Sequence, residues 1–279
     1  MIKSILLAVD GSAHTEFVLK YGIDFARRCQ AHLRVLTVVD IRFFEWAVAI
    51  GVEGFAPIIP SSTYQEESQR LLNEKADKLL ERAGQILQDA GQKFDLMKEN
   101  GSPVEVICEK SRLCDMIIMG ARGEFERWSD KMLGATLEAV TRLSIKPVFV
   151  VRKAYRPIKK ILLAYDGSMN SNRALPWAGY IGECFQAPLT IVNVNDSRED
   201  AETILKEAHD YLLSYKLPNL ETVRKEGDQP DRIVETCKEV EADMIIMGSY
   251  GHSRIREAIL GSTTVQVMRK SPVPILMVK

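Results

Sequence analysis

The sequence predicts an α/β protein made of two tandem, doubly wound domains, each with a five-stranded parallel sheet and helices on both faces. Two observations support this prediction. Short runs rich in Ile, Val and Leu alternate with longer segments of helical period, which is typical of βαβ units around a buried parallel sheet. The same series of segments then occurs twice within 279 residues, so each copy has a common domain length of about 100 to 150 residues.

An internal repeat defines the two copies. Ile5–Ser12 (ILLAVDGS) recurs 156 residues later as Ile161–Ser168 (ILLAYDGS), and DMIIMG occurs at Asp115–Gly120 and again 128 residues later at Asp243–Gly248. The difference between the two spacings gives the first copy 28 net extra residues, which fall between Asp40 and Asp115. Because a repeat of this kind marks duplicated structural units, we expect two domains, at 1–153 and 157–279.

Each segment of the second copy has a pattern that favours one element. Apolar runs favour strands, and the longer amphipathic segments favour helices, one of which has Pro230 near its first turn, where proline is common. The expected strands are 159–165, 189–194, 221–225, 243–247 and 274–278, and the expected helices are Asn170–Glu183, Glu199–Tyr215, Pro230–Val240 and Ser262–Lys270. In the first copy, Ser62–Asp89 predicts one long amphipathic helix.

The last strand of each copy is apolar and follows a proline, at Val148–Val151 and at Pro274–Val278. An apolar strand at the edge of a sheet invites uncontrolled pairing unless something covers it. We therefore expect these two strands to meet within one chain, so that the two domains form a pseudo-dimer.

Composition and charge exclude several classes of partner and location. The 37 Lys and Arg residues nearly balance the 38 Asp and Glu residues, and no long basic run is available for a phosphate backbone, which argues against nucleic acid. The apolar run Ile5–Val9 stops at Asp10, and no later run approaches the length of a membrane span, so we expect a cytoplasmic protein that does not enter membranes. The four histidines lack ligand-spaced companions, which argues against a zinc site.

Unusual residues follow two strands of the second copy. Asp166-Gly167-Ser168 comes after its first strand, and Gly248, Ser249 and Gly251 come after its fourth strand, followed by nine residues and then Gly261-Ser262-Thr263 at the start of a helix. Ligands of open parallel sheets bind at the carboxyl ends of strands, and a helix N-terminus offers free N–H groups to an anion. This pattern predicts a phosphate site without the lysine of a P-loop. The alternative for Asp166 is that it merely caps a turn.

These segments identify a family resemblance. Through VDGS, YDGS, the two DMIIMG strands and the G-2x-G-9x-G-S spacing, the chain resembles two fused members of the universal stress protein (Usp) family over nearly its whole length. The resemblance implies strand order 3-2-1-4-5, pairing of domains through their last strands, and ATP as ligand, alone or with Mg²⁺. It places Ala164, Tyr165, Asp166 and the backbone of Val194 at the adenosine, Met247 along the nucleotide, Gly248, Ser249 and Gly251 at the ribose and phosphates, and Gly261, Ser262 and Thr263 at the phosphates.

The first copy departs from this motif. Ten residues instead of nine separate Gly123 from Gly134, and Ala135 stands where the motif has a hydroxyl. Glu124 and Glu126 add negative charge that would oppose a triphosphate. We therefore expect ATP binding mainly by the second domain, with weaker or altered binding by the first domain as the alternative.

The function expected from these features is that of an ATP-binding stress-response regulator. No catalytic motif is visible, so any ATP hydrolysis should be slow. Two alternatives stay open, a nucleotide-free interaction scaffold and a slow ATP hydrolase, and the expected contacts extend to an unidentified protein partner or to a homodimer. The apolar, aromatic insert at 41–60 packs at the domain interface, covers the first site, or holds an apolar ligand.

Overall fold

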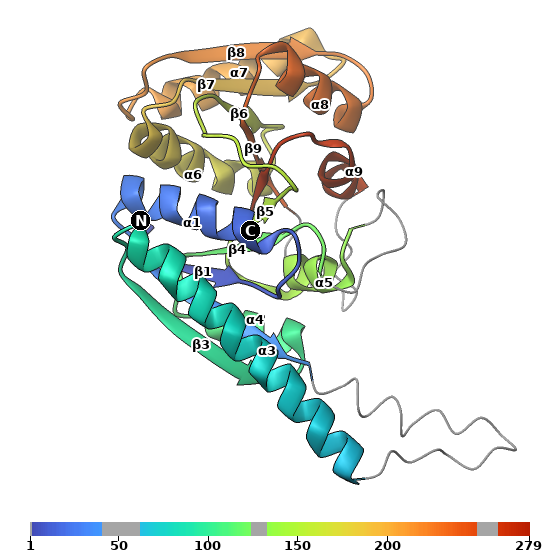
Figure 1. Ribbon diagram of the computed structural model, residues 1–279. Helices are drawn as coiled ribbons and strands as arrows, with labels where there is room; N and C mark the ends of the chain where they lie inside the picture. The colour runs from blue at the N-terminus through green and yellow to red at the C-terminus, as the bar shows by residue number, and fades with distance from the viewer. Residues whose placement is uncertain (1, 41–61, 124–132, 250–261) are drawn as a thin grey trace, which may run out of the picture.

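The computed structural model describes residues 2–40, 62–123, 133–249 and 262–279. Ten strands in this part of the chain form one continuous sheet, in the order β3-β2-β1-β4-β5-β10-β9-β6-β7-β8 (Figure 1). Read from its outer edge toward the centre, each half has the order 3-2-1-4-5. The predicted α/β class, the parallel five-stranded sheets and their strand order are confirmed. The apolar insert predicted at 41–60 lies outside the described residues.

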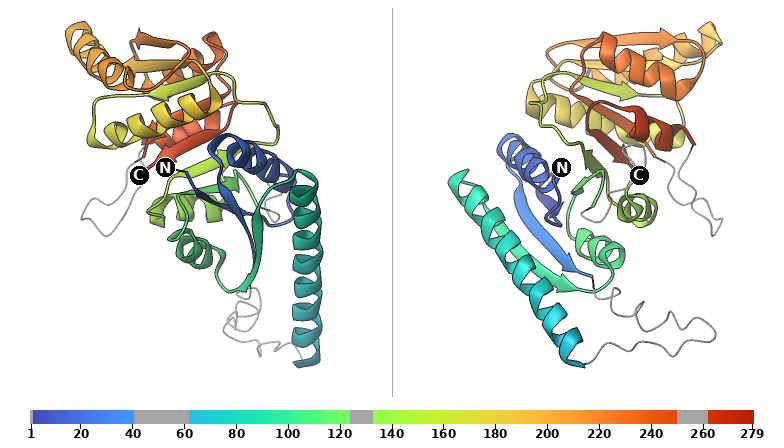
Figure 2. Two further views of the ribbon diagram at one scale, coloured as in Figure 1. Left: turned by 90° about the vertical axis from the view of Figure 1, so that its left-hand side faces the viewer. Right: turned by 45° about the vertical axis from the view of Figure 1, so that its right-hand side comes forward.

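The first half contains nine described elements. They are β1 (Ser4–Ala8), α1 (Thr15–Cys29), β2 (His32–Val39), α3 (Ser62–Asp89), β3 (Phe94–Asn100), α4 (Pro103–Ser111), β4 (Met116–Gly120), α5 (Ala135–Leu143) and β5 (Val148–Val151). The long helix α3 has the bounds that its amphipathic pattern predicts. It packs on β2 and β3 and projects beyond them (Figures 1 and 2).

The second half repeats the series. Its elements are β6 (Ile161–Ala164), α6 (Met169–Phe185), β7 (Leu189–Val194), α7 (Arg198–Leu212), β8 (Leu220–Lys225), α8 (Gln229–Glu239), β9 (Met244–Gly248), α9 (Ser262–Lys270) and β10 (Ile275–Val278). Most bounds lie within two residues of the expected ones. Helix α7 ends three residues before the expected Tyr215, because the chain turns there: the Leu217 N–H donates to the Tyr215 carbonyl, just before Pro218.

Helices cover both faces of the sheet. Helices α1, α3, α6 and α7 bury apolar side chains on one face, and α4, α5, α8 and α9 do so on the other (Figure 2). Strands such as β4, β5, β9 and β10 are buried along their length, because both of their faces are covered. Among the described residues, no helix combines the length and the apolar character needed to cross a membrane.

The two halves join through their last strands. β5 and β10 pair antiparallel, with Val150 opposite Ile275 and Phe149 opposite Leu276, which confirms the pairing expected from their apolar sequences. Aromatic rings of α1 and α6 extend this contact: Phe25 lies 5.2 Å from Phe149 and 5.0 Å from Phe185, measured between ring centroids. Because every other strand pair is parallel, the carboxyl ends of the strands lie at opposite edges of the sheet in the two halves.

Candidate functional site

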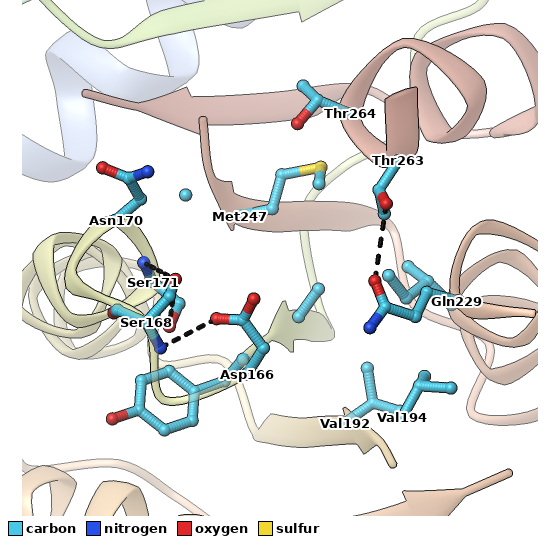
Figure 3. A pocket seen from close by; sticks show the side chains of 14 residues that line it. Asp166, Ser168, Asn170, Ser171, Val192, Val194, Gln229, Met247, Thr263 and Thr264 are labelled. Carbon is cyan, nitrogen blue, oxygen red and sulfur yellow. Dashed lines mark hydrogen bonds between the residues drawn. The ribbon is translucent and has the colours of Figure 1, made fainter. Parts of the chain in front are cut away.

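A cleft opens at the carboxyl ends of β6, β7 and β9, between the first turns of α6, α8 and α9 (Figure 3). Its empty volume is about 610 Å³, including the open space at its mouth. The cleft is lined by Ala164, Tyr165, Asp166, Ser168, Asn170, Ser171, Val192, Val194, Gln229, Ile233, Met247, Gly248, Thr263 and Thr264.

The turn after β6 fixes Asp166 in this cleft. Gly167 has a φ of 76°, which only glycine adopts without strain, and the Ser168 N–H donates to Asp166 Oδ1 at 3.0 Å. Ser168 in turn caps α6, because its hydroxyl accepts a hydrogen bond from the Ser171 N–H at 3.3 Å. One carboxylate oxygen therefore caps the turn, while the other points into the cleft (Figure 3).

The environment of Asp166 favours its charged form. Protein atoms on the inner side of the turn partly desolvate the carboxylate, and this effect raises its pKa. Hydrogen bonds from Ser168 and Ser171 act in the opposite direction and outweigh it, so the pKa of Asp166 lies below its usual value. The cleft thus presents a negative hydrogen-bond acceptor at neutral pH, which suits ligand hydroxyl groups.

Gly248 brings α6 close to the end of β9. A Cβ atom at Gly248 would lie 2.4 Å from the backbone carbonyl of Asn170 and 2.6 Å from the Ser171 nitrogen. Such contacts are too short for any side chain, so the first turn of α6 can take this position only beside a glycine. Gly248 thus lines the cleft and also lets the first turn of α6 approach β9, while its expected contact with the ribose and phosphates stays a prediction.

The opposite wall of the cleft contains the start of α9. Thr263 lies in its first turn and donates from its hydroxyl to Gln229 Oε1 at 3.4 Å (Figure 3). Thr264 is buried and Ser262 is exposed. The unpaired N–H groups of a first helical turn, with hydroxyls beside them, can accept an anion.

Seven predicted site residues line the cleft together: Ala164, Tyr165, Asp166, Val194, Met247, Gly248 and Thr263. Ser249 does not, because its side chain is fully buried and its hydroxyl donates to the Val278 carbonyl at 3.2 Å. Ser262 is in α9 but does not line the cleft. Gly251 and Gly261 lie outside the described residues.

The sequence reasoning missed the other seven lining residues. Val192 was detectable, since residues two apart on a strand share a face and Val194 was predicted. Ser168 belongs to the DGS turn, and Asn170 and Ser171 come soon after it, so their position was also readable. Gln229 and Ile233 come from the start of α8, and Thr264 faces inward from α9; no sequence pattern signals these contacts.

The first half keeps the turn but changes its surroundings. Gly11 has a φ of 80°, and the Ser12 N–H donates to Asp10 Oδ1 at 2.9 Å, as in the second half. His14, however, stands at the position of Asn170, and a Cβ on Gly120 would lie 2.6 Å from the His14 Cβ. The imidazole is buried; burial and then the charge of Lys153 lower its pKa, against an opposing effect of Asp10.

Known proteins resemble both halves of this arrangement. The profile of the Universal stress protein family matches residues 1–152 and 199–279, which is most of the chain. The chain belongs to the universal stress protein family. Universal stress protein Slr1230 of Synechocystis sp. is 30% identical over 284 residues, covering 99% of both chains. Stress response protein NhaX of Bacillus subtilis is 25% identical over 161 residues, covering 43% of this Usp chain and 97% of its own.

Solved structures support the tandem Usp arrangement. A universal stress protein from Archaeoglobus fulgidus has a TM-score of 0.80 and 26% identity, covering 99% of this chain and 98% of its own. Protein PA1789 of Pseudomonas aeruginosa has a TM-score of 0.64 at 18% identity, covering 100% of this chain and 92% of its own, and shows the fold alone. The ten-stranded sheet is therefore shared over its full length with other proteins.

Proposed function

We propose that this universal stress protein binds ATP in its second domain and acts as a nucleotide-dependent regulator. We take the domains to be residues 1–153 and 157–279. The proposal is carried by the cleft at the carboxyl ends of β6 and β9, where the capped Asp166 carboxylate faces the first turn of α9. Only the second domain combines this turn with the complete G-2x-G-9x-G-S spacing.

The residues of the cleft suit the parts of ATP. Val192, Val194 and Ile233 offer an apolar surface for a planar base, and the backbone of Val194 is the proposed contact of the adenine edge. The Asp166 carboxylate suits the ribose hydroxyls. Ala164, Tyr165 and Met247 complete the walls, and Gly248, Gly251, Gly261, Ser262 and Thr263 belong to the proposed phosphate segment. Ser249 lies in the same segment, but its N–H and its hydroxyl both donate to the Val278 carbonyl, so it helps to position the segment.

The same residues favour binding over hydrolysis. Asp166 is the single carboxylate that lines the described part of the cleft, and no His, Lys or Cys accompanies it there. The described residues contain no group of three or more His, Cys, Asp or Glu side chains able to hold a metal ion. We propose that any Mg²⁺ enters with the ATP phosphates and that hydrolysis, if present, is slow. The regulatory output would then be a change in contacts with a protein partner, or in homodimer formation, in the cytoplasm.

Calorimetric titration with ATP tests this function, and the internal repeat supplies a matched control. We expect one tight site per chain. Gly261→Val should abolish this site, because a branched side chain fills the space proposed for a phosphate, whereas the corresponding Gly134→Val in the first domain should leave it intact. Two equivalent tight sites, or loss of binding with Gly134→Val alone, would contradict the proposal.

A further inference from the structure

The linker between the halves fills a pocket on α1. The ring of Tyr155 lies 5.1 Å from the ring of Tyr21, between centroids, and its hydroxyl donates to the Asp24 carboxylate. The Lys20 ammonium lies 6.0 Å from the Tyr155 ring centroid. The Arg156 N–H donates to the Tyr21 hydroxyl at 3.1 Å and holds the linker in place. One aromatic side chain with a hydrogen-bond donor is thus seated against three residues of α1.

The repeat places an equivalent set of positions on α6. Pro176, Trp177 and Tyr180 follow Lys20, Tyr21 and Asp24 by 156 residues each. Together with Ile2 and Asp115, they line a pocket of about 390 Å³, including the open space at its mouth. Among the described residues, no side chain occupies this pocket in the way that Tyr155 occupies the corresponding place on α1.

The backbone beside the α6 pocket is anchored in the same way as the backbone beside Tyr155. Asp115 Oδ2 accepts hydrogen bonds from the N–H groups of Lys3, at 2.6 Å, and Ser4, at 3.0 Å. Its counterpart Asp243 accepts them from Lys159, at 2.9 Å, and Lys160, at 3.1 Å. The strands that enter the two halves are therefore anchored alike, and the difference between the two places lies in the linker's aromatic ring.

The walls of the α6 pocket suit an aromatic ring that carries a donor. Trp177 and Tyr180 provide aromatic surface, and ring pairs of this kind attract one another beyond simple apolar burial. Tyr180 is half-buried and packs against the apolar core of the second half, which limits the movement of that wall. Asp24 has no acidic counterpart on α6, since Tyr180 replaces it, but Asp115 supplies a carboxylate in the lining of the pocket.

We propose that this pocket is a binding site for a small phenolic molecule, an aromatic ring whose hydroxyl donates to Asp115. The chain's own Tyr155 demonstrates the chemistry at the equivalent place. Its lining, apolar apart from one carboxylate, suits a single ring that carries one hydroxyl. The site shares no residue with the proposed ATP cleft and does not depend on ATP binding.

The test uses 4-methylphenol, which reproduces the tyrosine side chain, and follows the indole N–H signal of Trp177 in NMR spectra of the full chain. The signal is assigned by its absence in Trp177→Phe. We expect a saturable shift with half-saturation near 1 mM, as for a ligand of this size, and intermolecular NOEs from the probe to Trp177. Toluene, which lacks the hydroxyl, should bind at least several-fold more weakly.

Two further experiments distinguish a small phenolic ligand from a tyrosine of a polypeptide and control for folding. Tighter binding of N-acetyltyrosine amide than of 4-methylphenol would overturn the small-molecule assignment in favour of a tyrosine from a polypeptide. Tyr155→Ala, which empties the equivalent place on α1, should lose thermal stability and regain part of it with 4-methylphenol, by more than the wild type gains. No shift of the Trp177 signal, no intermolecular NOE from the probe to Trp177, or no rescue of Tyr155→Ala would overturn the proposal.

Discussion

At the scale of single residues, two glycines at equivalent places differ in what surrounds them. Gly248 faces the backbone of Asn170 and Ser171, whereas Gly120 faces the side chain of His14. A backbone in a capped helical turn cannot move far without breaking the cap. At Gly120 the closest atom is the His14 Cβ, at 2.6 Å, whereas at Gly248 the three closest atoms all belong to the backbone of the capped turn, at 2.4 to 2.6 Å.

Gly248→Ala should therefore destabilise the protein more than Gly120→Ala. We expect a loss of about 1 to 3 kcal/mol in the free energy of unfolding for Gly248→Ala, the usual range for forcing extra atoms into a packed site, and a smaller loss for Gly120→Ala. Urea denaturation followed by circular dichroism measures both. Equal losses, or a larger loss for Gly120→Ala, would mean that the first turn of α6 adjusts freely.

At the scale of elements, β5 and β10 hold the halves together. Phe149 and Leu276 pair at the centre of this contact, and both are fully buried. If the chain is divided between residues 153 and 157, each half exposes an apolar strand edge, which readily pairs with another edge.

We expect the separated halves, 1–153 and 157–279, to associate with each other or with themselves. Analytical ultracentrifugation of each half, and of an equimolar mixture, measures this association. Phe149→Asp in the first half should weaken it, because the carboxylate would be buried without a partner. A second half that stays monomeric and fully stable at high concentration would show that the pairing is dispensable.

The individual elements also show how much of this structure the sequence predicts. The repeat and the apolar runs were sufficient for the strands, the pairing of β5 with β10 and the helix positions, because a parallel sheet covered on both faces requires continuous apolar strands. The strand order came from the family resemblance. The same reasoning located Asp166 and Thr263. It failed to show that the Ser249 side chain turns inward or that Gln229 lines the cleft, since these depend on where two distant elements pack.

At the scale of the whole molecule, one sheet runs through both halves without interruption. Shared strands and the aromatic contacts between α1 and α6 couple the two halves. Ligand binding to one half should then stabilise the entire chain, since a ligand that binds only the folded state stabilises it by mass action.

We expect a single thermal unfolding transition, and we expect ATP to raise its midpoint temperature. At an ATP concentration 100 times Kd, the free energy of unfolding should rise by about 2.7 kcal/mol. Differential scanning calorimetry with and without ATP measures it, and Gly261→Val, which we expect not to bind ATP, is the control. Two separate transitions, of which ATP moves one, would show that the halves unfold independently.

The linker that joins β5 to β6 makes the paired halves one chain, and this has an evolutionary consequence. In a dimer of identical subunits, each interface residue and each site occurs twice, so any substitution alters both copies at once. A fused pair is free of that constraint, and the linker also keeps the two edges at a high effective concentration. The two domains can then differ, as they do at His14 and Asn170 and in their glycine spacing. Every molecule carries one domain of each kind, in a ratio that no change in protein concentration can alter.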